Sequence, residues 1–176
     1  MTTYLILTAI GDDRPGLVGE LAAAISAHGG NWLESSMSHL AGKFAGIVKV
    51  AVANGDAEAL KAALGKLSGL KVSSETSVAG EPARGRRLRL SLVGHDRIGI
   101  VREVSQVLAR HAVNVEELTT RTSSAPMSAE LLFHADAELL ADAGLDARSL
   151  AADLERISDD LMVDIALDEA LKSSKG

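Results

Sequence analysis

The sequence predicts an α+β fold that contains two tandem copies of one β-α-β-β-α-β unit, with helices on one face of each antiparallel sheet. Residues 11–18 (Gly-Asp-Asp-Arg-Pro-Gly-Leu-Val) recur as residues 94–101 (Gly-His-Asp-Arg-Ile-Gly-Ile-Val), an offset of 94 − 11 = 83 positions. Of the 30 residues from 5 to 34, 11 are identical at that offset without a gap. In both halves, short apolar runs alternate with segments of helical spacing, which predicts the order of elements.

The elements of the first copy follow from hydrophobic spacing and turn-forming residues. Helical spacing runs from Leu17 to His28, and Gly29-Gly30-Asn31 would end that helix because Gly and Asn accept positive φ at little cost. Asp56 follows a turn and is expected to N-cap the second helix. The predicted strands are 4–10, 32–40, 44–53 and 70–77, with helices at 17–28 and after residue 56.

The second copy repeats this order. Helical spacing predicts a helix over 100–111, and Asp146 is expected to cap the next one. A turn at 123–126 is expected before a strand at 127–135, and residues 138–145 have no clear counterpart in the first copy. The other predicted strands are 88–93, 115–122 and 163–167. The residues that alternation places on one face of strand 127–135 are Met127, Ala129, Leu131, Phe133 and Ala135.

This order of elements is the ferredoxin-like arrangement, an antiparallel sheet with two helices on one face. Two tandem ferredoxin-like domains are expected, at 1–78 and 88–168. Residues 79–87, with Gly and Pro and no apolar period, are predicted to be the linker, and 169–176 a C-terminal tail. A unit of this size leaves part of its sheet uncovered, so the units are expected to pack by edge pairing or by their helix faces.

Composition disfavours several classes of protein. The chain has no cysteine, which excludes disulfides, thiolate metal sites and a cysteine nucleophile. It has 18 Lys and Arg against 24 Asp and Glu, a net charge of −6, and 2% aromatic residues, so direct nucleic-acid binding is not expected. No segment has the ~18 apolar residues of a membrane span. The N-terminus lacks the basic region of a secretory signal, so a cytoplasmic protein without membrane binding is expected.

The repeated loop before the first helix of each copy has a structural and a functional interpretation. In the structural one, Asp13 and Asp96 cap the helices, and Gly16 and Gly99 let each helix lie close to its sheet. In the functional one, the unpaired N–H groups of a helix N-terminus bind an anion. A glycine there lets a small molecule reach the backbone, and the carboxylate of an amino acid would suit those N–H groups. Gly16→Val is therefore expected to block binding and keep the fold.

Asn31 and Asn114 could supply an amide and a carbonyl to the same ligand. Each begins the strand that follows the first helix, which places it at the end of the sheet opposite the loop. A ligand role for either asparagine therefore needs a neighbouring unit.

Catalysis has little support in the sequence. The five histidines show no metal-ligand spacing, and no serine lies in the context of a nucleophile elbow. His28 and His111 are expected at helix C-termini, where a partial positive charge suits the helix dipole. We expect no catalytic residue, metal or cofactor, and therefore no enzyme.

Residues 11–18 followed by an amphipathic helix and His28-Gly29-Gly30-Asn31 resemble the ACT domain, a ligand-sensing ferredoxin-like module. Residues 94–101 with His111 and Asn114 resemble it too, except that Ile98 replaces the usual proline. Two such units in tandem are similar to the glycine cleavage system transcriptional repressor family. The ligand-binding residues that the resemblance implies are Asp13, Arg14, Gly16, Leu17 and Asn31, with Asp96, Arg97, Gly99, Ile100 and Asn114 in the second copy.

The resemblance also implies how the protein acts. A small, glycine-like amino acid would bind at contacts between ACT units of a homo-oligomer. The bound protein would then modulate transcription of amino-acid or one-carbon metabolism through a partner transcription factor, without touching DNA itself. Two alternatives stay open: an acylphosphatase-like hydrolase, which uses a similar fold and loop, and a free-standing regulatory subunit of an amino-acid metabolic enzyme.

Overall fold

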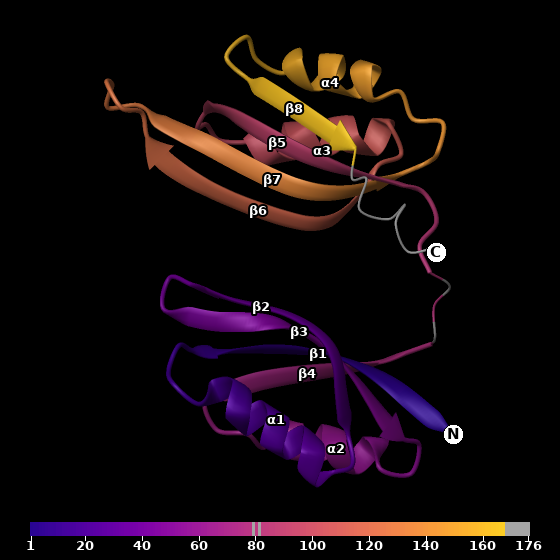
Figure 1. The fold of residues 1–176 in the computed structure, drawn as a ribbon. Coiled ribbons are helices and arrows are strands. Elements are labelled where there is room, and N and C mark those ends of the chain that lie inside the picture. The colour runs from indigo at the N-terminus through magenta and orange to yellow at the C-terminus, as the bar shows by residue number, and fades with distance from the viewer. Residues whose placement is uncertain (79, 81, 168–176) are drawn as a thin grey trace, which may run out of the picture. The chain divides into compact units, whose positions relative to one another are not determined.

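The computed structural model describes residues 1–78, 80 and 82–167. The chain divides into two compact units, Met1–Pro82 (unit one) and Ala83–Gly176 (unit two), each drawn in Figure 1. The tail predicted at 169–176 lies outside the described residues, as do residue 168 of the predicted second domain and residues 79 and 81 of the predicted linker.

Unit one is a four-stranded antiparallel sheet in the order β2-β3-β1-β4, with both helices on one face (Figure 1). Its two central strands pair over their whole length, from Thr2 opposite Ala53 to Asp12 opposite Lys43. The ferredoxin-like fold predicted for this half is confirmed. The elements are β1 Thr2–Asp12, α1 Leu17–Ala27, β2 Asn31–Leu40, β3 Lys43–Ala53, α2 Ala57–Leu64 and β4 Leu70–Ser77.

Unit two has the same topology, with strand order β6-β7-β5-β8 and its helices on one face of the sheet (Figure 1). β5 begins at Arg86, two residues before the predicted start of that strand. The predicted fold is again confirmed. The elements are β5 Arg86–His95, α3 Ile100–Arg110, β6 Asn114–Ser124, β7 Leu131–Ala141, α4 Ala147–Glu155 and β8 Met162–Leu167.

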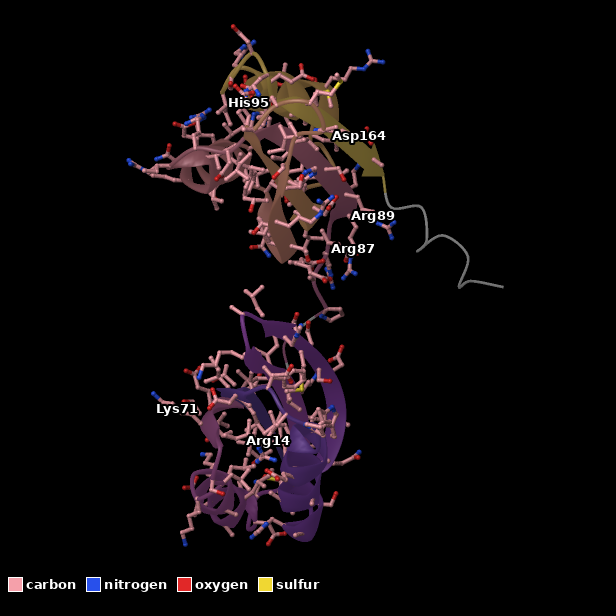
Figure 2. The ribbon with its side chains drawn as sticks, turned by 90° about the vertical axis from the view of Figure 1, so that its left-hand side faces the viewer. Arg14, Lys71, Arg87, Arg89, His95 and Asp164 are labelled. Carbon is pink, nitrogen blue, oxygen red and sulfur yellow. The ribbon has the colours of Figure 1, made fainter. Side chains whose placement is uncertain are left out.

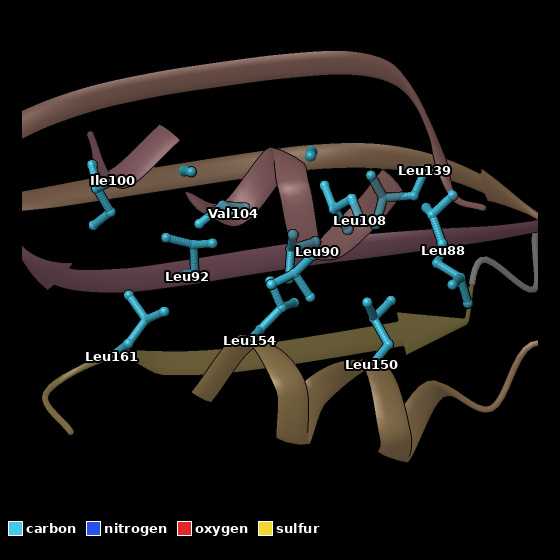
Figure 3. Close-up of a cluster of buried hydrophobic side chains, with 14 of the residues drawn as sticks. Leu88, Leu90, Leu92, Ile100, Val104, Leu108, Leu139, Leu150, Leu154 and Leu161 are labelled. Atoms are coloured by element: carbon cyan, nitrogen blue, oxygen red, sulfur yellow. The ribbon is translucent and has the colours of Figure 1, made fainter. Parts of the chain in front are cut away.

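Each unit has its own apolar core between sheet and helices. Alternate residues of β1 face α1 and α2, so Leu5 and Leu7 are fully buried. In unit two, Leu88, Leu90 and Leu92 of β5 are buried together with Leu150 and Leu154 of α4 (Figure 3). Among the described side chains, those that are buried are all apolar. Burial of each leucine contributes about 2 kcal/mol, so these two clusters dominate the stability of their units.

The bounds predicted for the strand at 127–135 are wrong, because the strand in this part of the chain, β7, spans Leu131–Ala141. Leu7 pairs with Val48 and Leu90 pairs with Ala137, so the offset between the units changes from 90 − 7 = 83 to 137 − 48 = 89. Six extra residues therefore lie in the β6–β7 turn, which is closed by the Ala125 amide donating to the Glu130 carbonyl at 2.9 Å.

The consequence is that Met127, predicted on the same strand face as Phe133, is fully exposed, and Ala129 also lies in the turn. Residues 138–141 complete β7 and are the counterpart of 49–52, which corrects the view that 138–145 match nothing. The apolar alternation continues in phase through the turn into the strand, so the pattern alone could not show where the strand begins.

Helix caps confirm one prediction and qualify another. Asp146 caps α4, accepting hydrogen bonds from the amides of Arg148 (3.0 Å) and Ser149 (3.4 Å). Asp56 is the N-cap residue of α2, but its side chain makes no capping hydrogen bond. The residue with positive φ after α1 is Gly29 (φ 67°), whereas Asn31 begins β2.

Ala112 holds the left-handed conformation (φ 52°) that Gly29 holds in unit one, since 112 − 83 = 29. A left-handed alanine costs about 1 kcal/mol because its Cβ crowds the following carbonyl oxygen. We expect Ala112→Gly to raise the free energy of unfolding of unit two by about 0.5–1 kcal/mol, measured by urea unfolding. Ala23→Gly, at an exposed position inside α1, is the control and should lower that of unit one by a similar amount.

Candidate functional site

The β1–α1 loop and its copy before α3 have the same backbone. In unit one, the amide of Asp13 donates to the Gly42 carbonyl at 2.9 Å, which ties the loop to the β2–β3 turn. In unit two, Asp96 donates in the same way to Leu131 at 2.9 Å. The repeated motif therefore builds one loop geometry twice, held by the hairpin beside it.

Gly16 and Gly99, not the aspartates, are the N-cap residues of α1 and α3. Both have φ 92°, and neither helix has a side-chain cap, so the predicted capping role of Asp13 and Asp96 is wrong. A Cβ on either glycine would meet no atom within 4 Å, so close packing on the sheet is not the reason for glycine either. The reason for glycine is the positive φ, which residues with a Cβ adopt only at a cost. Gly16→Val would therefore strain the loop as well as change the site.

Arg14 is held by Glu20 through two parallel hydrogen bonds, from Nη1 to Oε1 at 2.9 Å and from Nη2 to Oε2 at 2.8 Å. Figure 2 labels this arginine. Arg97 makes the same bidentate pair with Glu103 in unit two. The side-chain hydrogen bonds raise the pKa of each arginine and lower the pKa of each glutamate. Both guanidinium groups, predicted to bind ligand, thus fasten their loop to the first turn of the helix.

A hollow of about 150 Å³ lies at the start of α1 in unit one. Two of its lining residues, Gly16 and Gly19, have no side chain, and a Cβ on either would stand in open space. Phe44 of β3 also lines the hollow. The lining residues are Asp13, Arg14, Gly16, Leu17, Val18, Gly19 and Phe44.

The backbone amides at this hollow can bind an anion. In the described part of the chain, the amides of Leu17, Val18 and Gly19 donate to no protein acceptor, whereas the next amide, that of Glu20, donates to the Gly16 carbonyl at 2.9 Å. Three free N–H groups at the positive end of a helix favour a carboxylate. Asp13 also lines the hollow, and its Oδ2 lies 3.6 Å from Nδ1 of His39. A carboxylate at this place suits an ammonium group.

Asn31 and Asn114 lie far from these loops within their own units. Asn31 pairs with Ala51, which pairs with Tyr4, so it sits at the end of the sheet opposite Asp12. Eight residues of strand separate Tyr4 from Asp12, which is about 27 Å. Asn114 has the same place in unit two, where it pairs with Leu140 of the neighbouring strand. As expected from the sequence, no ligand of amino-acid size can contact both the loop and the asparagine of one unit.

The two loops differ at the positions that line the hollow. Arg102 stands where unit one has Gly19, at the 83-residue offset. The amide of Ile100 also has a partial acceptor, the carbonyl of Arg97 at 3.4 Å. The start of α3 therefore offers a ligand less open backbone than the start of α1.

The strand ends before the loops differ as well. Asp12 forms an ion pair with Lys43, while His95 at the matching position lies 3.1 Å from Glu130 and 3.2 Å from Asp160. The His95 amide also donates to Asp160 at 2.6 Å, which lowers the pKa of that carboxyl. The loop of unit two is thus fixed to two neighbouring turns by a histidine.

The two histidines predicted at helix ends have local partners. Nδ1 of His28, at the end of α1, lies 2.9 Å from the Ala24 carbonyl, and Nε2 of His111, at the end of α3, lies 2.7 Å from Asp153. Their predicted place at helix C-termini is confirmed. Across the described residues, no three His, Asp or Glu side chains gather as a set that could hold a metal ion. None of the helices described here has the length and apolar character to span a membrane.

Four residues at this site were not predicted from the sequence: Val18, Gly19, Phe44 and Glu20. One signal was available for Glu20, because an Arg–Glu pair six residues apart recurs in both copies. Gly19 gave no such signal, since glycine inside a helix usually only weakens it and its counterpart is Arg102.

Comparison with known proteins supports the fold. Residues 3–72 match the family model of the ACT domain. A solved structure described as an unknown protein from Galdieria sulphuraria has a TM-score of 0.83 and 27% identity, covering 96% of this chain and 99% of that chain. A candidate glycine cleavage system transcriptional repressor has a TM-score of 0.72 and 18% identity, covering 96% and 98%, a likeness that shows the fold alone. No curated protein sequence matches the chain.

Proposed function

Because residues 3–72 match the family model of the ACT domain and the second unit repeats the fold of the first, we propose that this tandem ACT-like protein is an amino-acid-sensing regulator without catalytic activity of its own. The observation that carries the proposal is the hollow at the start of α1. It combines three free backbone amides with two glycines and the Asp13 carboxylate. That set suits a zwitterion, whose carboxylate meets the amides and whose ammonium meets Asp13.

The hollow favours a small amino acid such as glycine or serine. Its volume is about 150 Å³, and its lining includes the large residues Val18 and Phe44. A long side chain would have to leave the hollow for solvent and would gain little there. We assign the stronger site to unit one because Arg102 replaces Gly19 in unit two. Asn31 and Asn114 would complete a site from a neighbouring unit, since each lies at the far end of its own sheet.

We further propose that the ligand changes association with a protein partner that controls transcription of amino-acid or one-carbon metabolism in the cytoplasm. The name of the structurally similar candidate glycine cleavage repressor motivates a role in transcription. The net charge of −6 disfavours direct binding to DNA, so a separate DNA-binding protein would carry the signal. A ligand changes such an association only if it binds one state better than the other.

The acylphosphatase-like alternative is weaker on chemical grounds. A free guanidinium would help to hold and activate an acyl phosphate in such a hydrolase, but Arg14 gives both terminal nitrogens to Glu20. The free-standing enzyme subunit differs from a transcriptional regulator only in its partner, so co-purification separates those two.

Titration calorimetry of the full chain with glycine, serine, alanine and phenylalanine tests the sensor proposal. We expect glycine or serine to bind with about one site per chain, and phenylalanine to bind at least about tenfold more weakly, a difference of about 1.4 kcal/mol. Native mass spectrometry of the same sample would report any amino acid that is retained. Absence of heat with every amino acid at millimolar concentration would remove the proposal.

A further inference from the structure

The open face of the unit-one sheet, on the side away from α1 and α2, has an apolar centre. Ile10 is 45% exposed and Ile47 is 54% exposed. Two shallow hollows of about 320 and 380 Å³ meet at Ile47, one toward Ile6 and the other toward Ile10. The register places these residues on the open face: Tyr4, Ile6, Thr8 and Ile10 of β1, Ala45, Ile47, Lys49 and Ala51 of β3, and Lys71, Ser73 and Glu75 of β4.

The same face of unit two is polar. Ile6 corresponds to Arg89 at the 83-residue offset, and Ile47 corresponds to Asp136 at the 89-residue offset that holds along β7. The two copies share the fold and the pattern of their cores, so the fold does not require isoleucine at these positions. Exposed apolar side chains grouped on one face of a sheet indicate a contact surface.

The charges on the unit-one face have a defined arrangement. Lys49 already has partners, Glu34 at 3.6 Å and the ring of Tyr4 at 5.6 Å. Lys71 and Glu75 of β4 form no ion pair with another described residue. Lys71 and Glu75 lie two residues before and two residues after Ser73 on β4. Ile10, Thr8 and Ile6 of β1 pair in turn with Lys71, Ser73 and Glu75. Lys71 and Glu75 are therefore equally far, in opposite directions along the strand, from the row that the paired residues Thr8 and Ser73 form across the sheet.

We propose that this face binds the same face of a second copy of the chain, about a two-fold axis that runs across the strands through the Thr8–Ser73 row. That rotation puts Lys71 against the partner's Glu75 and Glu75 against the partner's Lys71. It also puts Ile6 against the partner's Ile10 and Ile47 beside the partner's Ile47. A two-fold interface must be self-complementary, and the spacing of these four side chains on two strands meets that condition.

The geometry suits ordinary sheet packing. Face-to-face sheets lie about 10 Å apart with strand directions within about 30°, a separation that paired Lys and Glu side chains can span. With Glu34 of β2 and the paired ends Asp12 and Lys43 included, the face carries three lysines, two glutamates and one aspartate. It is therefore neutral, while the whole chain has a net charge of −6. A neutral apolar face lets two acidic chains meet without repulsion between their contact surfaces.

Sedimentation velocity of the full chain over a range of concentrations tests the proposal. We expect a dimer, and we expect Lys71→Glu or Glu75→Lys alone to raise its dissociation constant about tenfold or more by placing like charges together twice. The double variant with both changes should recover the wild-type value. An equimolar mixture of the two single variants should form a heterodimer, since every contact in it joins opposite charges.

Ile47→Asp should abolish the dimer, and Met127→Asp is its control, because Met127 is a fully exposed residue of unit two. Lys66→Glu, an exposed lysine beyond the end of α2, is the control for charge reversal. Circular dichroism of each variant checks the fold. A monomeric wild-type chain at every concentration would overturn the proposal. A dimer that persists in Ile47→Asp, or a mixture of single variants that shows no gain, would overturn it equally.

Discussion

Gly19→Leu will reduce the affinity for the bound amino acid by at least about tenfold, or about 1.4 kcal/mol, and will leave unit one folded. A Cβ at Gly19 meets nothing within 4 Å, so the fold accommodates the side chain, which then fills the hollow beside the free amides. Leucine is also a better helix former than glycine by about 0.8 kcal/mol, which helps α1. Titration calorimetry with the ligand of the wild-type chain measures the loss.

Ala23→Leu is the matched control for that variant. Ala23 is exposed on α1 one turn beyond Gly19 and does not line the hollow. Adding leucine there should leave the affinity within about twofold of wild type, because a surface side chain away from the ligand changes little. Equal affinities in the Gly19 and Ala23 variants would place the ligand elsewhere than the start of α1.

Gly11→Ala will lower the free energy of unfolding of unit one by about 2–3 kcal/mol. A Cβ at Gly11 would lie far inside van der Waals contact with the Gly69 carbonyl oxygen and 3.1 Å from Cδ2 of Leu70. The obstacle is backbone, so a change of rotamer cannot relieve it, and β4 would have to move away from β1. Urea unfolding, followed by circular dichroism, should show an earlier transition for one unit only.

Gly55→Ala separates this clash from the general effect of replacing glycine. A Cβ at Gly55 meets no atom within 4 Å, and Gly55 does not have positive φ. That variant should stay within about 0.5 kcal/mol of wild type. If Gly11→Ala were as stable as Gly55→Ala, the close approach of β1 to the start of β4 would not be a constraint on the fold.

The glycine that opens both motifs shows what a repeat can and cannot reveal. Gly11 and Gly94 recur at one offset, which marks the position as constrained. The cause is visible only in the fold: a Cβ at Gly94 would approach Cδ1 of Leu161 at 2.8 Å, just as Gly11 faces Leu70. In both units the obstacle comes from residues at or just before the start of the last strand, more than fifty residues further along the chain.

The β6–β7 turn shows where periodicity fails. Alternation in the second unit continues in phase before and after the true start of β7, so it could not locate the six extra residues. The aspartates of the loops show where residue preference fails. Asp13 is a good capping residue by type, but the chain takes a left-handed turn at Gly16 before α1 begins, which moves the cap three residues along.

The sequence alone determined the duplication, the order of the strands and helices, the ferredoxin-like fold and the choice of the loop before the first helix of each copy as a candidate site. These follow from spacing and turn chemistry within a few neighbouring residues, which the chain displays directly. The tertiary structure alone decided that Arg14 is bound to Glu20 and that Phe44 and Gly19 line one hollow. It also decided that Lys71 and Glu75 lie on the open face of the unit-one sheet, on either side of Ser73. Each of these depends on strand register and on how a helix lies against a sheet. Both are set by contacts between residues far apart in the chain, which local patterns do not contain.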